Sequence, residues 1–189
     1  MNNLNRLVSS EGEELILVDG QDNEIGYSSK SDCHDGDGLL HRAFSLFLFN
    51  EKGQLLLQQR SEKKRLWPGY WSNSCCSHPR RGESLSIAAM RRLGDELNVT
   101  ASLKLIYHFK YQAHFEGIGS ENELCHVFLG KLKGKVHPNQ NEIERIRFIA
   151  ANDLDNEFNE RPEEFTPWFL KEWKTLRESH SSELSNYLM

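Results

Sequence analysis

The chain has 189 residues, 38% hydrophobic and 27% charged, a composition typical of one ordinary globular domain. The formal net charge is −5 and no long run of Lys or Arg occurs, which argues against a general nucleic-acid-binding protein. No segment is apolar enough to span a membrane and the N-terminus does not resemble a signal peptide, so we expect a cytoplasmic protein with no membrane partner. Its four cysteines are then expected to be thiols.

The first part of the chain contains three predicted strands. The apolar run ELILVD (14–19) is followed by the turn signal GQDN. The run LLHRAFSLFLFN (39–50) favours a strand, and EKGQ then connects it to LLLQQR (55–60), which predicts a hairpin.

The stretch SLSIAAMRRLGDELNV (84–99) is the clearest predicted helix. Ser84 is placed to accept a hydrogen bond as its N-cap. Apolar side chains fall on one stripe of this helix at positions Leu85, Ala88, Ala89, Leu93 and Leu97. A helix is therefore expected between two groups of strands.

The second part of the chain is predicted to hold more strands and then two helices. The strands are expected at 103–115, 122–132 and 144–150. A short helix is expected near ANDLDNEF and an amphipathic one near EEFTPWFLKEWKTLRESH. No internal repeat or linker interrupts the chain. The predicted fold class is α/β (α+β), a single domain over residues 1–189 with mixed β-sheets packed against helices.

Two adjacent cysteines, Cys75 and Cys76, precede His78 in the stretch WSNSCCSHP. If this stretch is extended, Cys76 and His78 point one way, and Cys75 and Asn73 point the other. The two sulfurs then differ in role: one packs as a small buried hydrophobe, and the other is placed to be reactive or to bind a metal. The stretch lacks the paired C-x₂-C spacing of a structural zinc site.

Three histidines and two glutamates form a candidate metal set. Glu121 and Glu123 share one face of a predicted strand, and neighbouring carboxylates are costly to bury unless a cation or a proton lies between them. His34, His41 and His78 complete a mixed nitrogen and oxygen set that suits Mn, Fe, Zn or Mg. Each residue also has a simpler interpretation: a solvated loop histidine, a strand-end histidine, an exposed acidic edge. The prediction of a metal site depends on these residues meeting in space.

Several strings of the sequence share an order and spacing with a known family. They are LLHRAFSLFLFN, KKRLWPGYWSNSCCSHP, GES, RRLGDELNV, HFKYQA, ENELCHVF and FTPWF. Together they resemble the type 1 isopentenyl-diphosphate isomerases of the Nudix superfamily. The resemblance covers about residues 14–175, and it implies a Nudix-like core over that range. It also implies isomerisation of isopentenyl diphosphate to dimethylallyl diphosphate, a step of isoprenoid biosynthesis.

The resemblance assigns roles to individual residues. The family segment N-S-x-C-x-H-P selects Cys76 as the catalytic thiol and leaves Cys75 in a variable position. Glu123 matches the second proton-transfer residue, and Tyr111 matches a tyrosine that assists this carboxylate. The implied metal ligands are His34, His41, His78, Glu121 and Glu123. The ion expected there is Mn²⁺ or Mg²⁺, with Zn²⁺ as a further option.

A separate diphosphate subsite is also implied by the resemblance. Arg60, Lys64 and Arg92 match basic positions that meet the diphosphate. Glu96 matches a ligand for a second, substrate-bound Mg²⁺, and Trp168 matches an aromatic residue beside the hydrocarbon. Simpler interpretations exist here as well: Arg92 and Glu96 are spaced as an i,i+4 helical salt bridge, and Trp168 fits the core of an amphipathic helix. The expected partner is a small diphosphate, and the expected state is a monomer or weak homodimer.

The implied chemistry explains why these residue types are needed. Moving an unactivated double bond by one carbon requires one proton to be added and another removed, which a thiol and a carboxylic acid can do. The intermediate is a tertiary cation that needs a dry pocket and gains from an aromatic face.

Two other functions are alternatives for this sequence, a Nudix hydrolase of a nucleoside diphosphate derivative and a non-catalytic metal-stabilised binding module. The hydrolytic signature G-x₅-E-x₇-R-E-U-x-E-E-x-G-U is degenerate here. Ser77 replaces its first Gly, Arg92 replaces a Glu and Asn98 replaces its last Gly. This departure favours the isomerase over the hydrolase, and the presence of both Cys76 and Glu123 argues against the binding module.

Overall fold

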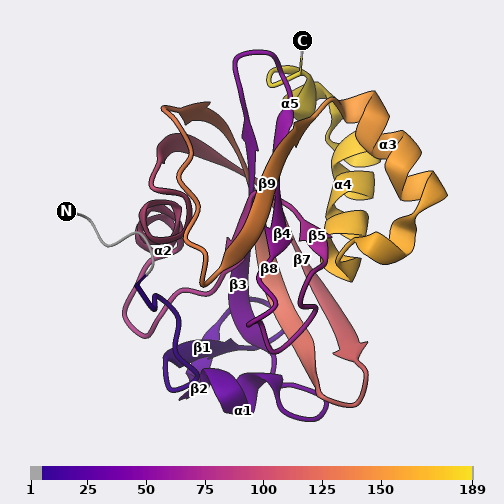
Figure 1. The fold of residues 1–189 in the computed structure, drawn as a ribbon. Coiled ribbons are helices and arrows are strands. Elements are labelled where there is room, and N and C mark those ends of the chain that lie inside the picture. Colours follow the sequence, from indigo (N-terminus) through magenta and orange to yellow (C-terminus); the bar gives the residue numbers. More distant parts are fainter. Residues whose placement is uncertain (1–5, 189) are drawn as a thin grey trace.

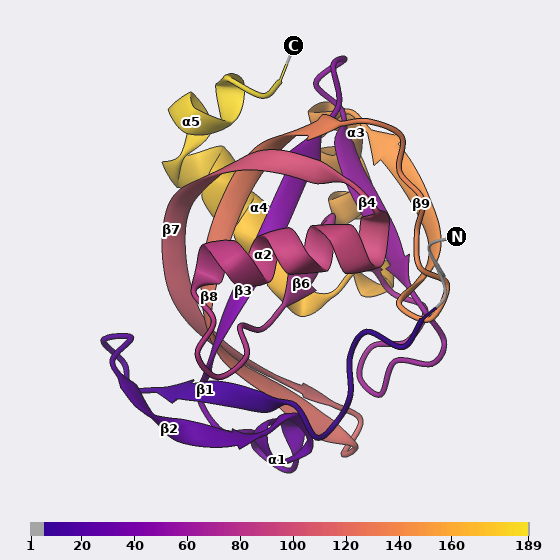
Figure 2. The same ribbon diagram turned by 90° about the vertical axis from the view of Figure 1, so that its left-hand side faces the viewer.

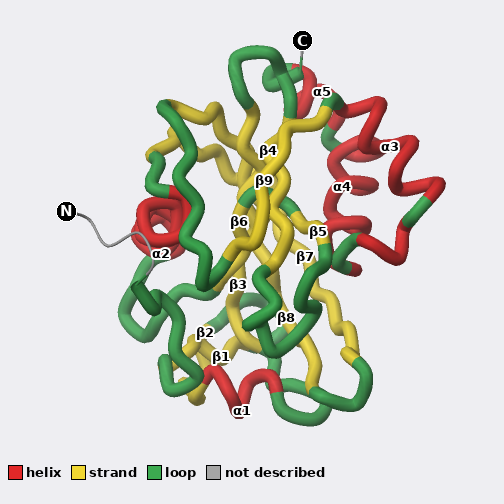
Figure 3. The backbone as a smooth tube through the Cα atoms, viewed as in Figure 1, coloured by secondary structure: helices red, strands yellow, loops and turns green. Residues whose placement is uncertain are grey.

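The computed structural model describes residues 6–188, which fold around one mixed β-sheet with helices on two sides (Figure 1). The strands are β1 (Glu14–Val18), β2 (Glu24–Ser29), β3 (His41–Phe49), β4 (Leu55–Arg60), β5 (Trp71–Ser72), β6 (Cys75–Ser77), β7 (Thr100–Phe115), β8 (Gly119–Lys133) and β9 (Ile143–Ile149). The helices are α1 (Lys30–His34), α2 (Leu85–Arg92), α3 (Ala151–Glu160), α4 (Pro167–Ser179) and α5 (Ser181–Ser185). Strands fill the centre and most helices lie at the periphery (Figure 3).

Strand β3 organises the sheet. It pairs in parallel with β8 along its length, so that His41 lies opposite Glu123, and it pairs antiparallel with β6, where Ser45 lies opposite Cys76. The long strands β7 and β8 form an antiparallel hairpin, and β4 pairs with β5 and β9. Strands β3 and β4 are paired at one position only, Phe49 opposite Leu55. The predicted hairpin of residues 39–60 therefore has its turn, but its two strands diverge directly after it.

Alternate side chains of β3 enter two different hydrophobic cores. Phe47 and Phe49 pack on the side of α4, whereas Phe44 and Leu46 pack on the side of α2. Figure 1 shows α2 on one side of the sheet and α3 with α4 on the other. The continuous apolar run of this strand therefore reflects a strand that is covered on both faces.

The predicted helix of residues 84–99 is confirmed in its first half. The Ser84 side chain accepts a hydrogen bond from the Ile87 amide at 3.4 Å, as expected of an N-cap. After Arg92 the chain continues as a π-helical segment, Leu93–Leu97, and Asn98 ends it in the left-handed conformation with φ of 54°. This widened turn was not predicted, because the apolar spacing alone does not distinguish it from an α-helix.

The later elements agree with the predictions to within a few residues, and three short elements were missed. Strands β7, β8 and β9 and helices α3 and α4 lie where they were expected, with a 3₁₀ turn, Pro162–Glu164, before α4. Strand β2 and helices α1 and α5 were not predicted. They are five or six residues long, and segments this short carry little periodicity. No helix within the described residues is long and apolar enough to cross a membrane.

Candidate active site

A cavity of about 170 Å³ opens beside the ends of β3, β6 and β8 that carry the predicted site residues. Ten of those residues line it: His34, Arg60, Lys64, Cys76, His78, Arg92, Tyr111, Glu121, Glu123 and Trp168. Two do not. His41 lies just beneath the lining with no exposed surface, and Glu96 is buried behind Arg92.

The five predicted metal ligands meet at one end of this cavity. One potential ligand atom from each of them lies within 4.8 Å of all the others. His34 Nε2 lies 2.9 Å from Glu121 Oε2, and His78 Nε2 lies 2.8 Å from Glu123 Oε1. His41 Nε2 is 3.8 Å from the same Glu123 oxygen and has no hydrogen-bond partner among the described residues, although it is buried.

Backbone carbonyls hold His34, the last residue of α1, and His41, the first residue of β3. His34 Nδ1 donates to the Lys30 carbonyl oxygen at 2.6 Å, and His41 Nδ1 donates to the Leu39 carbonyl oxygen at 2.7 Å. In each ring the other nitrogen, Nε2, faces the cluster, where that of His34 is paired with Glu121 and that of His41 has no hydrogen-bond partner among the described residues. An Nδ1–H bound to a carbonyl is the usual support for a metal-ligating histidine. The three-nitrogen, two-oxygen set and the buried, unpaired His41 Nε2 therefore fit a divalent metal.

Sheet register explains how the sequence assembles this cluster. His41 and Glu123 are opposite one another on β3 and β8, and Glu121, two positions earlier on β8, shares the face of Glu123. His78 comes directly after β6, which pairs with β3. The His34 end of α1 packs over β8 at Gly119, where a Cβ would clash with the His34 carbonyl oxygen.

Burial and neighbouring charge set the protonation of the cluster. Burial lowers the pKa of His41 to about 4 and lowers the pKa of His78 as well, so both rings are neutral, as metal ligands must be. Burial would also lower the pKa of His34, but the Glu121 carboxylate outweighs it and raises that pKa. The same pair keeps the pKa of Glu121 at about 2, whereas burial and the charge of Glu121 raise the pKa of Glu123.

Cys76 and Cys75 lie on opposite faces of the sheet, as predicted. The Cys75 side chain is fully buried in the core beneath α2, and Cys76 lines the cavity together with His78. Burial raises the pKa of Cys76 to about 12, with the nearby Arg60 opposing this effect, so the group is a thiol. The Tyr111 hydroxyl donates a hydrogen bond to Glu123 Oε2 at 2.6 Å. Cys76 and the Tyr111–Glu123 pair thus face one cavity from different strands.

Arg60 and Trp168 are both built into the cavity wall. Arg60 donates from Nε to the Trp67 carbonyl oxygen at 3.0 Å and from Nη2 to the Leu66 carbonyl oxygen at 2.8 Å, and Nη1 lies 3.9 Å from Cys76 Sγ. Its guanidinium carbon is 5.2 Å from the centre of the Trp168 ring. Trp168 is 2% exposed and belongs to the core on the α4 side, as its simpler interpretation expects, and it also lines the cavity.

The basic residues at the other end of the cavity form an alternating network with two carboxylates. Arg92 Nε donates to Glu96 Oε1 at 2.7 Å, which is the i,i+4 pair expected from the spacing, but each side chain is only 2% exposed. Arg92 Nη2 also lies 3.4 Å from Glu142 Oε2, and the same Glu142 oxygen binds the Lys64 ammonium. The pair is therefore part of a buried network rather than a surface salt bridge.

Sequence reasoning missed several residues of the cavity. Lys30 precedes His34 by one helical turn, and this spacing was a usable signal. Lys63 and Arg65 flank Lys64 in the basic run EKKR, which was a weaker one. Glu142 gave no signal, because it meets Arg92 only through the fold, 50 positions apart in the sequence.

An N-terminal strap, defined here as residues 6–13, completes the cavity wall with Leu7, Ser9 and Glu11. Arg92 Nη1 donates to the Val8 carbonyl oxygen at 2.9 Å, and Lys30 Nζ donates to Ser9 Oγ at 2.8 Å. Figure 2 shows the strap passing from the β9 side toward α1. Two basic side chains of the cavity, Arg92 and Lys30, thus already donate hydrogen bonds to the strap.

Comparison with known proteins yields a domain match and close relatives. The NUDIX domain matches residues 39–169. The chain is 41% identical over 174 residues to isopentenyl-diphosphate Delta-isomerase 1 of Photorhabdus laumondii, covering 91% of this chain and 99% of that protein. It is 45% identical over 164 residues to isopentenyl-diphosphate Delta-isomerase of Serratia proteamaculans, covering 87% of this chain and 91% of that protein.

Solved structures show the same fold at much lower identity. DR0079 from Deinococcus radiodurans superposes with a TM-score of 0.71 at 20% identity, over 86% of this chain and 98% of that one. RenU, a Nudix hydrolase from M. smegmatis, superposes with a TM-score of 0.54 at 18% identity, over 75% of this chain and 86% of that one. These likenesses confirm the predicted fold class, an α+β domain with mixed β-sheet packed against helices.

Proposed function

The chain belongs to the isopentenyl-diphosphate isomerases of the Nudix family, and from this premise we propose how its cavity converts isopentenyl diphosphate into dimethylallyl diphosphate. The observation that carries the proposal is the convergence of Cys76 and the Tyr111–Glu123 pair on one cavity, next to five grouped metal ligands. Both groups needed to add and remove a proton are present there. The substrate class is a small-molecule diphosphate.

Cys76 and Glu123 are the proposed proton-transfer residues. One adds a proton to an end of the double bond and the other removes a proton from the far side of the reacting carbons. After each turnover the two groups have exchanged protonation states, so protons must return to them before the next cycle. Tyr111 is the proposed assistant, because its hydroxyl already holds Glu123 Oε2 at 2.6 Å.

The metal site is proposed to support Glu123. His34, His41, His78, Glu121 and Glu123 would hold the ion, and we propose Mn²⁺ or Mg²⁺, with Zn²⁺ as the further option. When bound, it supplies a positive charge that tunes and orients the Glu123 carboxyl group. The protein's own contribution is the backbone support of His34 and His41, which directs their Nε2 atoms at the cluster.

The diphosphate is proposed to bind at the Lys64 and Arg92 end of the cavity. Arg60 was expected to join them, but two of its donors are taken by backbone carbonyls, and its third side faces Cys76. We therefore propose that Arg60 meets the substrate between the diphosphate and the reacting carbons. Trp168 presents its ring to the same region, where an aromatic face stabilises a developing cation.

Glu96 remains the proposed ligand for a substrate-bound Mg²⁺. Its carboxylate contacts Arg92 and does not line the cavity, so it would have to bind Arg92 and the ion at the same time. The proposal further includes one domain over residues 1–189, a monomer or weak homodimer with no nucleic-acid or membrane partner, and a cytoplasmic location.

The test is a deuterium-incorporation assay. The protein is incubated with isopentenyl diphosphate and Mg²⁺ in D₂O, and the product is followed by NMR. We expect deuterated dimethylallyl diphosphate from the parent protein and none from Cys76→Ala. The matched control is Cys125→Ala, which removes another buried thiol of the same core and should keep the activity. Full activity in Cys76→Ala, or none in the parent protein with metal bound, would contradict the proposal.

A further inference from the structure

The carboxylate of Glu142 is a buried member of the cavity that none of the expected roles uses. It is 3% exposed and lines the cavity beside Lys64 and Arg92. One oxygen, Oε2, binds the Lys64 ammonium and lies 3.4 Å from Arg92 Nη2. Burial alone would raise its pKa, but these two cations hold that pKa at about 2. Glu142 is thus an anion placed between two residues proposed to bind diphosphate.

The backbone around Glu142 is held from two directions. The Asn139 amide donates to the Glu96 carbonyl oxygen at 2.8 Å, which ties this loop to the π-helical segment that carries Glu96. The Ser61 amide donates to the Glu142 carbonyl oxygen at 3.0 Å, which ties it to the turn that carries Lys64. The Glu142 amide in turn donates to the Asn139 carbonyl oxygen at 2.9 Å. The position of the carboxylate is therefore set by the fold and not by the two cations alone.

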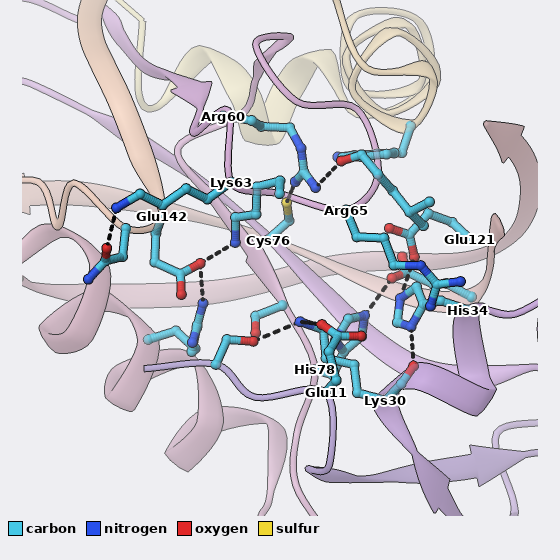
Figure 4. A pocket seen from close by; sticks show the side chains of 18 of the residues that line it. Glu11, Lys30, His34, Arg60, Lys63, Arg65, Cys76, His78, Glu121 and Glu142 are labelled. Atoms are coloured by element: carbon cyan, nitrogen blue, oxygen red, sulfur yellow. Dashed lines mark hydrogen bonds and ion pairs between the residues drawn. The ribbon is translucent and has the colours of Figure 1, made fainter. Parts of the chain in front are cut away.

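We propose that Glu142 is a positioning residue of the diphosphate subsite, which holds the Lys64 ammonium and the Arg92 guanidinium side by side so that one diphosphate meets both. The inference rests on the proposed function. Figure 4 shows the Glu142 carboxylate with a contact on each of two sides. Without it the two like charges repel, and the long Lys64 side chain is released toward solvent.

Two effects of the carboxylate oppose each other. Its negative charge competes with the diphosphate for the two cations, whereas its hydrogen bonds hold those cations in the binding geometry. An ammonium has three donors, so Lys64 keeps donors for the diphosphate while it binds Glu142. Of the five donors of the Arg92 guanidinium, Glu96, the Val8 carbonyl and Glu142 take three, so Arg92 has less capacity to spare than Lys64. Arg92 also keeps Glu96 as a second anion. The geometry therefore favours positioning, because ordering a flexible lysine in advance lowers the cost of binding.

Paired variants separate the two effects. Glu142→Gln removes the charge but keeps an oxygen acceptor, and Glu142→Ala removes both. Calorimetry with inorganic pyrophosphate and Mg²⁺ reports the subsite without requiring turnover, and steady-state assays give KM and kcat. Glu144→Ala, on the exposed side of β9, is the control.

We expect Glu142→Ala to weaken pyrophosphate binding at least tenfold and to raise KM similarly, with kcat within about threefold. Glu142→Gln should weaken pyrophosphate binding and raise KM much less than Glu142→Ala does, because the amide oxygen still accepts a hydrogen bond. Unchanged or tighter binding in both variants would overturn the proposal, because a competing charge predicts that result. If Glu142→Ala does not fold, Glu142→Asp carries the test, because it keeps the charge but shortens the side chain that reaches Lys64 and Arg92. It should weaken pyrophosphate binding in the parent and have less effect in the Lys64→Ala background, and an equal effect refutes positioning. If the parent protein has no isomerase activity but the variants change pyrophosphate binding as expected, the proposed function is overturned and the positioning role of Glu142 stands.

Discussion

Replacing Glu172 by Gln tests how strongly the interior of this protein perturbs a carboxyl group. Glu172 lies on α4 with no exposed surface, and the Cys125 thiol donates to its Oε1 at 3.5 Å. Its other oxygen, Oε2, is buried without a hydrogen-bond partner among the described residues. Burial raises the pKa of this carboxyl group from 4.5 to about 8. It therefore carries a proton at neutral pH in the folded protein.

The raised pKa makes the folded state less stable as the pH rises. In the unfolded chain the group loses its proton near pH 4.5, whereas the folded protein retains it up to about pH 8. Between these limits each pH unit removes about 1.4 kcal/mol from the free energy of unfolding. The stabilisation is complete below pH 4.5 and lost by pH 8, so the change approaches about 5 kcal/mol as an upper bound. Gln has no proton to lose and should show none of this dependence.

Urea unfolding of the parent protein and Glu172→Gln, at intervals from pH 5 to pH 8 with chelator present, measures the difference. Other titrating groups are common to both proteins, so they cancel. We expect the free energy of unfolding of the variant, relative to that of the parent, to increase by about 3–4 kcal/mol between pH 5 and pH 8. Glu178→Gln, an exposed residue of the same helix, should run parallel to the parent. Parallel curves for Glu172→Gln as well would refute the reasoning, since the carboxyl group would then keep an ordinary pKa.

Three further predictions concern the active site. Removal of metal by chelator should lower Tm and increase hydrogen exchange over residues 30–42, because the five grouped ligands lose the charge that holds them together; unchanged exchange would count against metal-coupled order there. Gly119→Ala should weaken metal binding at least tenfold, because the new Cβ clashes with the His34 carbonyl oxygen. Gly20→Ala is the control, since its Cβ would lie in open space. Equal metal affinities of the two variants in a titration would show that α1 adjusts without cost. Tyr111→Phe should lower kcat by about 10- to 100-fold with little change in KM. This is the effect expected when a hydrogen bond to a charged group, worth about 1.5–3 kcal/mol, is lost. An unaltered kcat would remove Tyr111 from the mechanism.

Residues that share a strand face were predictable, because strand periodicity is local. The opposite orientations of Cys75 and Cys76, and the common face of Glu121 and Glu123, follow from the period of 2 and are confirmed. That His34, His41 and His78 join those glutamates was not readable from spacing. It depends on the parallel pairing of β3 with β8 and on the packing of α1, which are long-range features.

Buried charged residues were the least predictable part of the site. Glu142 and Arg92 come from different segments, and nothing near either one in the sequence indicates the other. Glu172 lies in a helix with an amphipathic pattern, where a glutamate normally belongs to the solvent face, yet it points into the core. The burial of such residues is decided by tertiary packing, which a single sequence does not record.

The N-terminal strap bears on where this enzyme tolerates changes to its chain. Leu7, Ser9 and Glu11 form part of the cavity wall, so an insertion or deletion within residues 6–13 alters the wall itself. The other terminus is remote from it. Tyr187 packs against Phe49, at the opposite end of β3 from His41, roughly 26 Å along the strand. A partner linked after Tyr187 is therefore attached at the end of the sheet remote from the cavity, where it leaves the residues of the cavity wall unchanged.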